Sequence, residues 1–339
     1  MVRLKDIAEK AGVSSMTVSR ALNGKEKDIS QATAEKIKKI AEEMGYVPNS
    51  SARALASHTT TKLIAALLMD YEGDPNPLID SYNSSFLGEF SREIQKNGYD
   101  LMLHFIKDYS EINYCLKSWS VAGAVFMGFF DDNIRQIQED NPIPLVFTDS
   151  YSTVRRITNV GIDDFHGGEL AARYFLEHGH RNVAFLGPAA IGNGVVMHRL
   201  QGFCTVLREA GIQLPGERII SLTYGQSLEE LLKELKKGPD PVTGIFTTAD
   251  NCALDLYAAA YRLGWRIPDD LSIIGFDDNS VSSRVVPPLT TIRQDICQKA
   301  RLACQLLMRK IADPKSPAEN LILDVEIACR ESVKDLTGC

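Results

Sequence analysis

Carboxylate side chains stand where several short apolar segments of the sequence end. Asp70, Asp149 and Asp250 each close such a segment, and Asp277 and Asp278 together close another. If these segments are parallel strands, their carboxyl ends lie where open α/β sheets bind ligands. Carboxylates that converge there accept hydrogen bonds from adjacent hydroxyl groups, so the pattern favours a polyol ligand. A strand-end aspartate can equally cap the helix that follows it, and that alternative stays open for each one.

Sequence motifs for catalysis and for metal binding are absent. The glycine-rich segment 187–194 fits neither the dinucleotide-binding motif nor the phosphate-binding loop. There is also no Gly-x-Ser-x-Gly motif and no His/Glu metal motif. The seven cysteines include no Cys-x-x-Cys pair, and their odd number suits reduced thiols better than a disulfide framework. We therefore expect no enzyme, no cofactor and no metal ion.

The apolar segments alternate with amphipathic stretches of helix length, such as residues 84–97. Short apolar runs typical of parallel strands cover residues 63–70, 99–106, 121–128, 143–149, 182–188, 242–250 and 271–278. Two successive series of this kind predict two doubly wound lobes, each with a parallel sheet covered by helices.

The first sixty residues have a different, helical pattern. Apolar residues at helical spacing predict three short helices, the first ended by Gly12 and the third by Gly45. Ser14 and Ser30 stand at the N-cap positions of the second and third helices. Two short helices joined by a tight turn that contains glycine form a helix-turn-helix.

The second of these helices predicts a DNA-reading surface. Its outward positions are Ser15, Met16, Thr17, Ser19 and Arg20. Ser15 and Met16 can touch base edges or thymine methyl groups in the major groove, and Arg20 can pair with guanine. A plain three-helix bundle, with Arg20 as a solvated surface charge, is the alternative.

Charge and composition are consistent with a DNA-binding head on a larger body. The net charge of the 339-residue chain is −7, yet residues 1–58 hold ten Lys and Arg against seven Asp and Glu. The composition is 44% hydrophobic and 24% charged, which permits sizeable cores. The N-terminus is charged, and no stretch approaches the length of a membrane span, so we expect a cytoplasmic protein.

Two regions of the sequence resemble a known family. The segments LKDIAEKAGVSSMTVSRALNGK and EKIKKIAEEMGYVPNSSARALAS are similar to the DNA-binding headpiece of the lactose/galactose repressor family of bacterial transcriptional regulators. The segments NVGIDDFHGGELAARYFLEHGHRNVAFLGP and SIIGFDDNSVSSRVVPPLTTIRQD resemble the same family and periplasmic sugar-binding proteins. The loop from Gly24 to Ser30 departs from the family by being slightly longer.

The resemblance implies an all-α helix-turn-helix headpiece followed by an α/β sensor of the periplasmic-binding-protein type. The expected domains are a headpiece at 1–48, a hinge helix and linker at 49–60, and a ligand-binding and dimerisation domain at 61–339. In that domain the N-lobe would take about 61–160 plus 291–320, and the C-lobe about 161–290 plus 321–339.

The resemblance also implies a role for particular residues on DNA. Bases would be read by Ser15, Met16 and Arg20, and the DNA backbone or the helix register would be held by Thr17, Ser19, Asn23, Thr33, Tyr46 and Asn49. Ala52, Leu55 and Ala56 would lie in the minor groove, with Leu55 as a wedge between base steps. A flexible linker with an incidental leucine is the alternative for this last segment.

For the effector, the resemblance points most directly to Arg199 and Asp277, and then to Asp149, Asp250 and Asn193. Arg199 could instead be a surface charge on a helix. Tyr71 and Tyr224 stand where aromatic side chains stack on ligands, although core packing would also explain them.

These expectations combine into a repressor that binds near-palindromic operator DNA as a homodimer and responds to a small effector, expected to be a saccharide. The chain ends soon after NLILDVEIACRES without a leucine-heptad helix, which favours a dimer over a tetramer. A purine, a phosphorylated ligand or a protein co-regulator remains an alternative effector. A sugar-binding protein without DNA function, serving a transporter, is the alternative of a different class.

Overall fold

The computed structural model describes residues 2–22, 29–46, 61–70, 76–129, 133–150, 157–188, 194–222 and 226–338. The chain divides into two compact units between Thr61 and Lys62. The smaller unit contains the helices α1 (Leu4–Ala11), α2 (Ser15–Leu22) and α3 (Gln31–Glu43). Ile7, Val18 and Ile37 are fully buried where these three helices meet.

Both predicted helix caps of this unit are confirmed. The Ser14 hydroxyl accepts a hydrogen bond from the Thr17 amide at 3.1 Å, and the Ser30 hydroxyl accepts one from the Thr33 amide at 3.2 Å. Gly12, which ends α1, has φ +72°, in the left-handed region that favours glycine. The turn between α1 and α2 therefore has the helix-turn-helix form that the sequence predicts.

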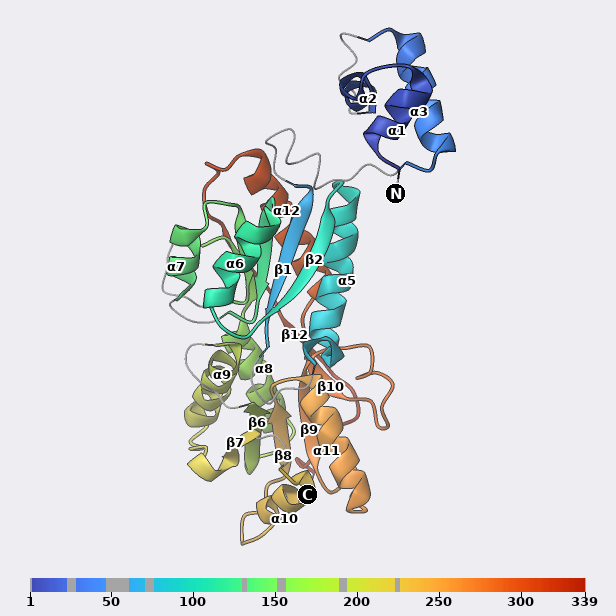
Figure 1. Cartoon of the computed structure of the whole chain (residues 1–339). Helices are drawn as coiled ribbons and strands as arrows, with labels where there is room; N and C mark the ends of the chain where they lie inside the picture. Colours follow the sequence, from blue (N-terminus) through green and yellow to red (C-terminus); the bar gives the residue numbers. More distant parts are fainter. Residues whose placement is uncertain are drawn as a thin grey trace. The chain divides into compact units, whose positions relative to one another are not determined.

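The larger unit begins with a six-stranded sheet that is parallel throughout. Its strands are β1 (Leu63–Met69), β2 (Asp100–Ile106), β3 (Gly123–Met127), β4 (Leu145–Thr148), β5 (Asn159–Ile162) and β11 (Asn320–Leu323), in the order β11-β5-β4-β3-β1-β2. The helices α5 (Ser81–Lys96) and α12 (Ile296–Ala312) pack on one face, and α6 (Ser110–Trp119) and α7 (Asn133–Asp140) on the other (Figure 1). A short 3₁₀ helix, η2 (Pro77–Ile79), precedes α5.

The second sheet also has six strands. They are β6 (Val183–Pro188), β7 (Ile219–Leu222), β8 (Gly244–Thr247), β9 (Ser272–Asp277), β10 (Thr290–Arg293) and β12 (Glu326–Ala328), in the order β12-β10-β9-β8-β6-β7. The edge strand β12 is antiparallel to β10, and the other neighbours are parallel. The helices α8 (Asp164–Glu177) and α9 (Val195–Glu209) cover one face, and α10 (Leu228–Leu235) and α11 (Asp250–Arg262) cover the other. A further short 3₁₀ helix, η3 (Gly216–Arg218), precedes β7.

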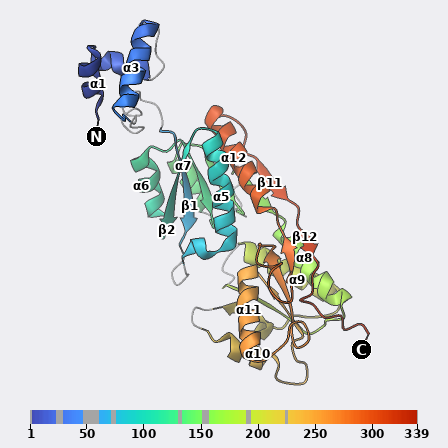
Figure 2. The same ribbon diagram turned by 90° about the vertical axis from the view of Figure 1, so that its right-hand side faces the viewer.

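The chain passes between the two lobes three times, as the two views in Figures 1 and 2 show. It passes from β5 to α8, from β10 to α12, and from β11 to β12. Strand β10 pairs in the second sheet and β11 in the first, so the changes of lobe after residues 293 and 323 come a few residues later than the expected boundaries near 290 and 320. The chain changes lobe later because β10 stays paired with β9 up to Arg293, and β11 stays paired with β5 up to Leu323.

Candidate functional site

The outward face of α2 carries the side chains predicted to read DNA bases. Ser15, Met16 and Arg20 are exposed, and 65% of the Met16 surface is accessible. Val18 and Ala21, on the opposite side of the helix, are fully buried. The apolar side of α2 thus fixes the helix, while a face with hydroxyl, thioether and guanidinium groups is presented in the manner that major-groove recognition requires.

The residues predicted to hold the DNA backbone are only partly described. Thr17 and Thr33 follow the capping serines, and their hydroxyls lie 2.9 Å and 2.8 Å from those of Ser14 and Ser30. Ser19 and Tyr46 are half-buried, and Tyr46 packs against the head core. The residues outside the described part of the chain are Asn23, Asn49, Ala52, Leu55 and Ala56.

In the larger unit, a buried ion pair lies at the carboxyl end of the first sheet. Asp149 directly follows β4, and its carboxylate oxygens lie 2.7 and 2.9 Å from the Lys299 ammonium of α12. Lys299 is fully buried. The Tyr82 hydroxyl, from α5, donates to the same carboxylate at 2.5 Å. Three elements of one lobe therefore bring their polar groups together at the strand ends, as a buried charge requires.

Gln294 connects this pair to the second lobe. Its side-chain oxygen accepts from the Lys299 ammonium at 2.7 Å, and its side-chain nitrogen donates to Asp277 at 2.6 Å. Asp277 ends β9, and Gln294 lies where the chain passes from β10 to α12. A continuous line of polar contacts thus joins the strand ends of the two sheets.

Both acids in this line have unusual backbone conformations. Asp149 has φ +53° and Asp277 has φ +113°, a region that residues other than glycine rarely adopt. Such strain is held only where surrounding contacts fix it, and it is concentrated at functional sites. At these two positions the surrounding contacts are the Lys299 and Gln294 hydrogen bonds.

Arg199 of α9 is buried rather than a solvated surface charge. Its Nε atom donates to Asp164 at 2.7 Å, and a second nitrogen donates to the Thr248 carbonyl. The guanidinium carbon lies 3.5 Å from the centre of the Phe276 ring, a cation–π contact. The predicted clamping arginine is therefore already ordered by groups of its own lobe, next to the strand that ends in Asp277.

The electrostatic field of the site is acidic. Burial raises the pKa of Asp277 well above its usual range, Arg199 opposes this, and Asp250 and Asp80 add to it. Burial and the Asp149 carboxylate likewise raise the pKa of Tyr82, with smaller contributions from Asp277 and Asp164. Tyr82 belongs to one lobe and Asp277 to the other, and the Gln294 hydrogen bonds to Lys299 and Asp277 bring the acids of both lobes into one line of contacts.

Asp250, the third predicted acid, is engaged within its own lobe. It is fully buried and accepts hydrogen bonds from the Ser282 hydroxyl at 2.6 Å, the Thr291 hydroxyl at 2.6 Å and the Asn279 amide at 2.8 Å. Gly275 of β9 allows this carboxylate to approach, because a Cβ atom there would lie 2.2 Å from it. The geometry is that of a structural group that ties strand ends together.

Asp278, the strand-end acid next to Asp277, forms ion pairs of its own. The Asp278 carboxylate pairs with Arg293 and Arg330. A further contact between the lobes joins the Asn251 amide to Asp80, at 3.3 Å. Asn193, Tyr71 and Tyr224 lie outside the described residues.

Sequence reasoning missed five members of the site: Asp80, Tyr82, Asp164, Gln294 and Lys299. One of them had a signal in the sequence. Lys299 falls on the face of α12 that carries Ile296, Ala300 and Ala303, which are buried. A lysine on an apolar helix face must find a buried partner, and that requirement could have identified it.

Comparison with known proteins finds similar sequences along almost the whole chain. The profile of bacterial regulatory proteins of the lacI family matches residues 3–49, and that of the periplasmic binding protein-like domain matches residues 172–333. The probable HTH-type transcriptional repressor ExuR of Bacillus subtilis (strain 168) is 31% identical over 99% of this chain and 100% of its own length. The chain belongs to the lacI family of bacterial regulatory proteins.

Solved structures of this family agree in fold. The lac repressor dimer bound to operator and the anti-inducer ONPF has a TM-score of 0.83 at 25% identity, with 98% of this chain and 99% of that chain covered. The transcriptional regulator CelR–cellobiose complex has a TM-score of 0.71 at 25% identity, with 98% of this chain and 100% of that chain covered. The fold class predicted from the sequence, a helix-turn-helix head with a two-lobed α/β sensor, is confirmed.

Membership of this lacI family makes the chain a DNA-binding transcriptional regulator, and the family is one of regulators, not of enzymes. None of the described helices combines the length and hydropathy that a bilayer-spanning segment needs. Within the same described ranges, His, Cys, Asp and Glu side chains form no group that could hold a metal ion.

Proposed function

We propose that this protein is a repressor whose affinity for operator DNA is set by a saccharide bound between the two lobes. The observation that carries the proposal is the line of buried polar contacts from Asp149 through Lys299 and Gln294 to Asp277. This line joins a carboxylate and a cation of one lobe to a carboxylate of the other, at the strand ends where such sheets bind ligands.

In this proposal the smaller unit reads DNA as the sequence predicts. Ser15, Met16 and Arg20 contact base edges, and the backbone set of Thr17, Ser19, Asn23, Thr33, Tyr46 and Asn49 fixes the register. Residues 1–48 form the headpiece, 49–60 the hinge that wedges Leu55 into the minor groove, and 61–339 the sensor. Since operator DNA is the partner, the protein acts in the cytoplasm as a homodimer on two half-sites.

The charges of the site favour a neutral, hydroxyl-bearing ligand over a phosphorylated one. Four acids belong to the polar contacts of the site, namely Asp80, Asp149, Asp164 and Asp277. Two buried cations, Arg199 and Lys299, are each paired with one of these acids. An additional phosphate would add to the uncompensated negative charge, whereas hydroxyl groups donate to carboxylates. The cellobiose complex of CelR supports the saccharide class.

Among the predicted effector residues we assign direct ligand contacts to Arg199, Asp277 and Asp149, with Asn193, Tyr71 and Tyr224 as further contacts. Asp250 receives a structural role instead, because its two oxygens already accept three hydrogen bonds. The ligand changes DNA affinity only if it binds one arrangement of the lobes better than the other. A coupling of about 1–3 kcal/mol would change operator affinity about 5–150-fold.

The test is a thermal-shift screen of the full chain against monosaccharides, disaccharides, sugar phosphates and purines, followed by gel shifts on operator DNA. A ligand at about 100 times its dissociation constant adds about 2.7 kcal/mol to the free energy of unfolding. Asp277→Asn should abolish that gain. Asp240→Asn, the same charge change on an exposed turn, should retain it.

A stabilising purine or sugar phosphate would contradict the saccharide assignment and leave the regulator assignment intact. Operator affinity that stays unchanged at saturating ligand would contradict the coupling between sensor and head.

A further inference from the structure

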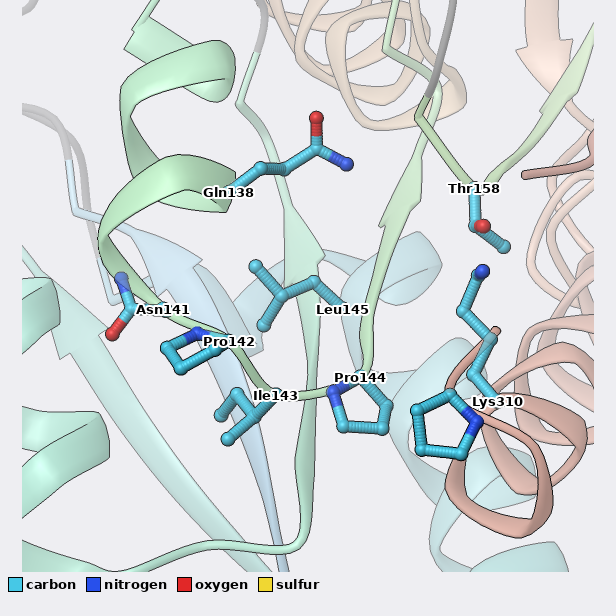
Figure 3. Close-up of a pocket in the computed structure, with 9 residues that line it drawn as sticks. Gln138, Asn141, Pro142, Ile143, Pro144, Leu145, Thr158 and Lys310 are labelled. Carbon is cyan, nitrogen blue, oxygen red and sulfur yellow. The ribbon is translucent and has the colours of Figure 1, made fainter. Parts of the chain in front are cut away.

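A cavity lies far from the strand ends that carry Asp149 and Asp277, at the opposite edge of the first sheet. Its volume is about 300 Å³, at the lower limit for small-molecule pockets. The lining residues come from the end of α7, the segment that leads into β4, the residue before β5, and the end of α12: Gln138, Asn141, Pro142, Ile143, Pro144, Leu145, Thr158, Lys310 and Pro314 (Figure 3). It shares no lining residue with the site between the lobes.

Thr158 places an unsatisfied hydroxyl group in this cavity. The side chain is 2% exposed, and its Oγ1 atom has no hydrogen-bond partner among the described residues. Buried hydroxyl groups of folded proteins are nearly always paired, so an unpaired one requires an explanation. A ligand atom that accepts or donates a hydrogen bond at Thr158 supplies one.

Lys310 supplies a positive charge to the same cavity. Figure 3 shows its side chain extending toward Thr158, with Gln138 across the cavity. Lys310 is the one charged side chain among the nine lining residues. Its ammonium donates to the Ser316 carbonyl at 3.0 Å and more weakly to the Pro317 carbonyl at 3.4 Å, and an ammonium has three donors.

The remaining wall of the cavity is largely apolar. Pro142, Ile143, Pro144 and Leu145 form a continuous segment along it. Asn141 adds little to ligand recognition, because its amide nitrogen already donates to the Asn113 side chain and to the Ile137 carbonyl. The wall thus suits a flat apolar body, and Thr158 with Lys310 suits an anionic group attached to it.

We propose that this cavity is a second ligand site, which binds a small organic anion, a carboxylate or a phosphate ester, with an apolar body. The anionic oxygen accepts hydrogen bonds from the Thr158 hydroxyl and the Lys310 ammonium, and the body packs on the segment 142–145.

The site lies at the edge of the sheet where the chain arrives from the smaller unit. The Pro144 carbonyl accepts from the Ala124 amide at 2.9 Å, and the Leu63 carbonyl, at the start of β1, accepts from the Ala122 amide at 2.8 Å. The cavity therefore lies at the edge of the sheet where β1 begins, although its lining comes from the segments before β4 and β5 and from the end of α12.

The test uses the full chain, with phenyl phosphate and benzoate as anionic probes and benzyl alcohol as the neutral one. Binding is followed by methyl NMR at Ile143, Leu145 and Thr158. We expect both anions to bind and benzyl alcohol to bind at least tenfold more weakly, a difference of about 1.4 kcal/mol. Thr158→Val, which keeps the shape of the side chain and removes the hydroxyl, should weaken the anions about tenfold without loss of thermal stability.

Lys310→Met should weaken the anions similarly. Its matched control is Lys315→Met, the same charge change at an exposed position of the turn that follows α12, which should leave binding unchanged. The proposal is overturned if neither anion binds at about 10 mM, where even a millimolar site fills. It is equally overturned if benzyl alcohol binds as well as the anions, or if Thr158→Val and Lys310→Met behave like the control.

These outcomes are independent of the saccharide site. Asp277→Asn should leave the anions bound, and failure of the anion test would leave the thermal shifts with saccharides as they are.

Discussion

Gly202 and Gly168 allow α9 and α8 to cross at backbone contact. A Cβ atom on Gly202 would lie 1.9 Å from the Phe165 carbonyl oxygen, and one on Gly168 would lie 2.0 Å from the Arg199 carbonyl oxygen. Ordinary van der Waals contacts of a Cβ begin at 3.4 Å, so Gly202→Ala would have to move the two helices apart by about 1.5 Å. Neither neighbour is the end of a flexible side chain that could turn aside.

The displacement would reach the candidate effector site directly. Arg199 lies on α9 and Asp164 on α8, and the hydrogen bond between them is 2.7 Å long. An added separation of about 1.5 Å exceeds what a hydrogen bond tolerates. Overpacking costs about 1–3 kcal/mol, and a broken buried ion pair costs about 3–5 kcal/mol, while alanine in a helix recovers up to about 1 kcal/mol. We expect a net loss of about 3 kcal/mol or more in the free energy of unfolding.

The assay is urea unfolding of the full chain followed by the fluorescence of Trp265, which packs in the same lobe. The matched control is Gly88→Ala in α5, where a Cβ would meet nothing within 4 Å. That variant should gain about 0.5–1 kcal/mol from helix propensity alone. A Gly202→Ala protein with the wild-type urea midpoint and unchanged ligand response would refute the reasoning, since it would mean that the helices do not meet at their backbones.

Three further predictions concern the head, the buried ion pair of the first lobe and pH. Arg20→Ala should relax base preference at one operator position by about 1–3 kcal/mol, measured by competition against random DNA, whereas equal losses on operator and random DNA would exclude Arg20 from base reading. Lys299→Met leaves the Asp149 carboxylate buried without its cation and should lower the urea-derived free energy of unfolding by about 3–5 kcal/mol, and Asp149→Asn in the same chain should recover part of that loss. Burial lowers the pKa of His180 to about 4. The folded chain therefore keeps this imidazole neutral, whereas the unfolded chain protonates it near pH 6.5. Because of this difference, the free energy of unfolding should fall by roughly 3 kcal/mol as pH drops from about 6.5 to about 4. His180→Gln should flatten that part of the stability profile, and an identical profile in the variant would contradict the assignment to His180.

The helices of the head and the longer strands could be predicted because their signals are local. Ser14 and Ser30 cap helices within three residues of their own position, and Gly12 ends α1 through its own φ. Strands such as β1 are continuous runs of apolar residues, a pattern that is visible in the sequence without any knowledge of tertiary contacts. The short strands β5 and β10 were not singled out, because they carry buried Asn159 and Thr290 in place of an apolar run.

The site was predicted in part for a related reason. Asp149, Asp277 and Arg199 were predicted from strand-end position or from the resemblance to the family, but their partners lie far along the chain. Lys299 is 150 residues from Asp149, and the contact exists only because α12 returns to the first sheet after the chain has passed through the second lobe. Asp250 carries the same strand-end signal as Asp277, and only the position of Ser282 and Thr291 separates a structural acid from a candidate ligand contact.

The same contacts that build the site also limit what a ligand can do there. Each candidate ligand group is already hydrogen-bonded within the protein: Asp149 to Lys299, Asp277 to Gln294, and Arg199 to Asp164. A ligand hydroxyl that merely adds to these bonds would bind without favouring either arrangement of the lobes, and such binding shifts no equilibrium. A ligand that takes Gln294 away from Asp277 would instead release the link between the two sheets, at the segment where β10 leads into α12. The change in operator affinity that the effector causes should therefore depend more on whether it displaces Gln294 than on the number of hydroxyl groups that the effector offers to the acids.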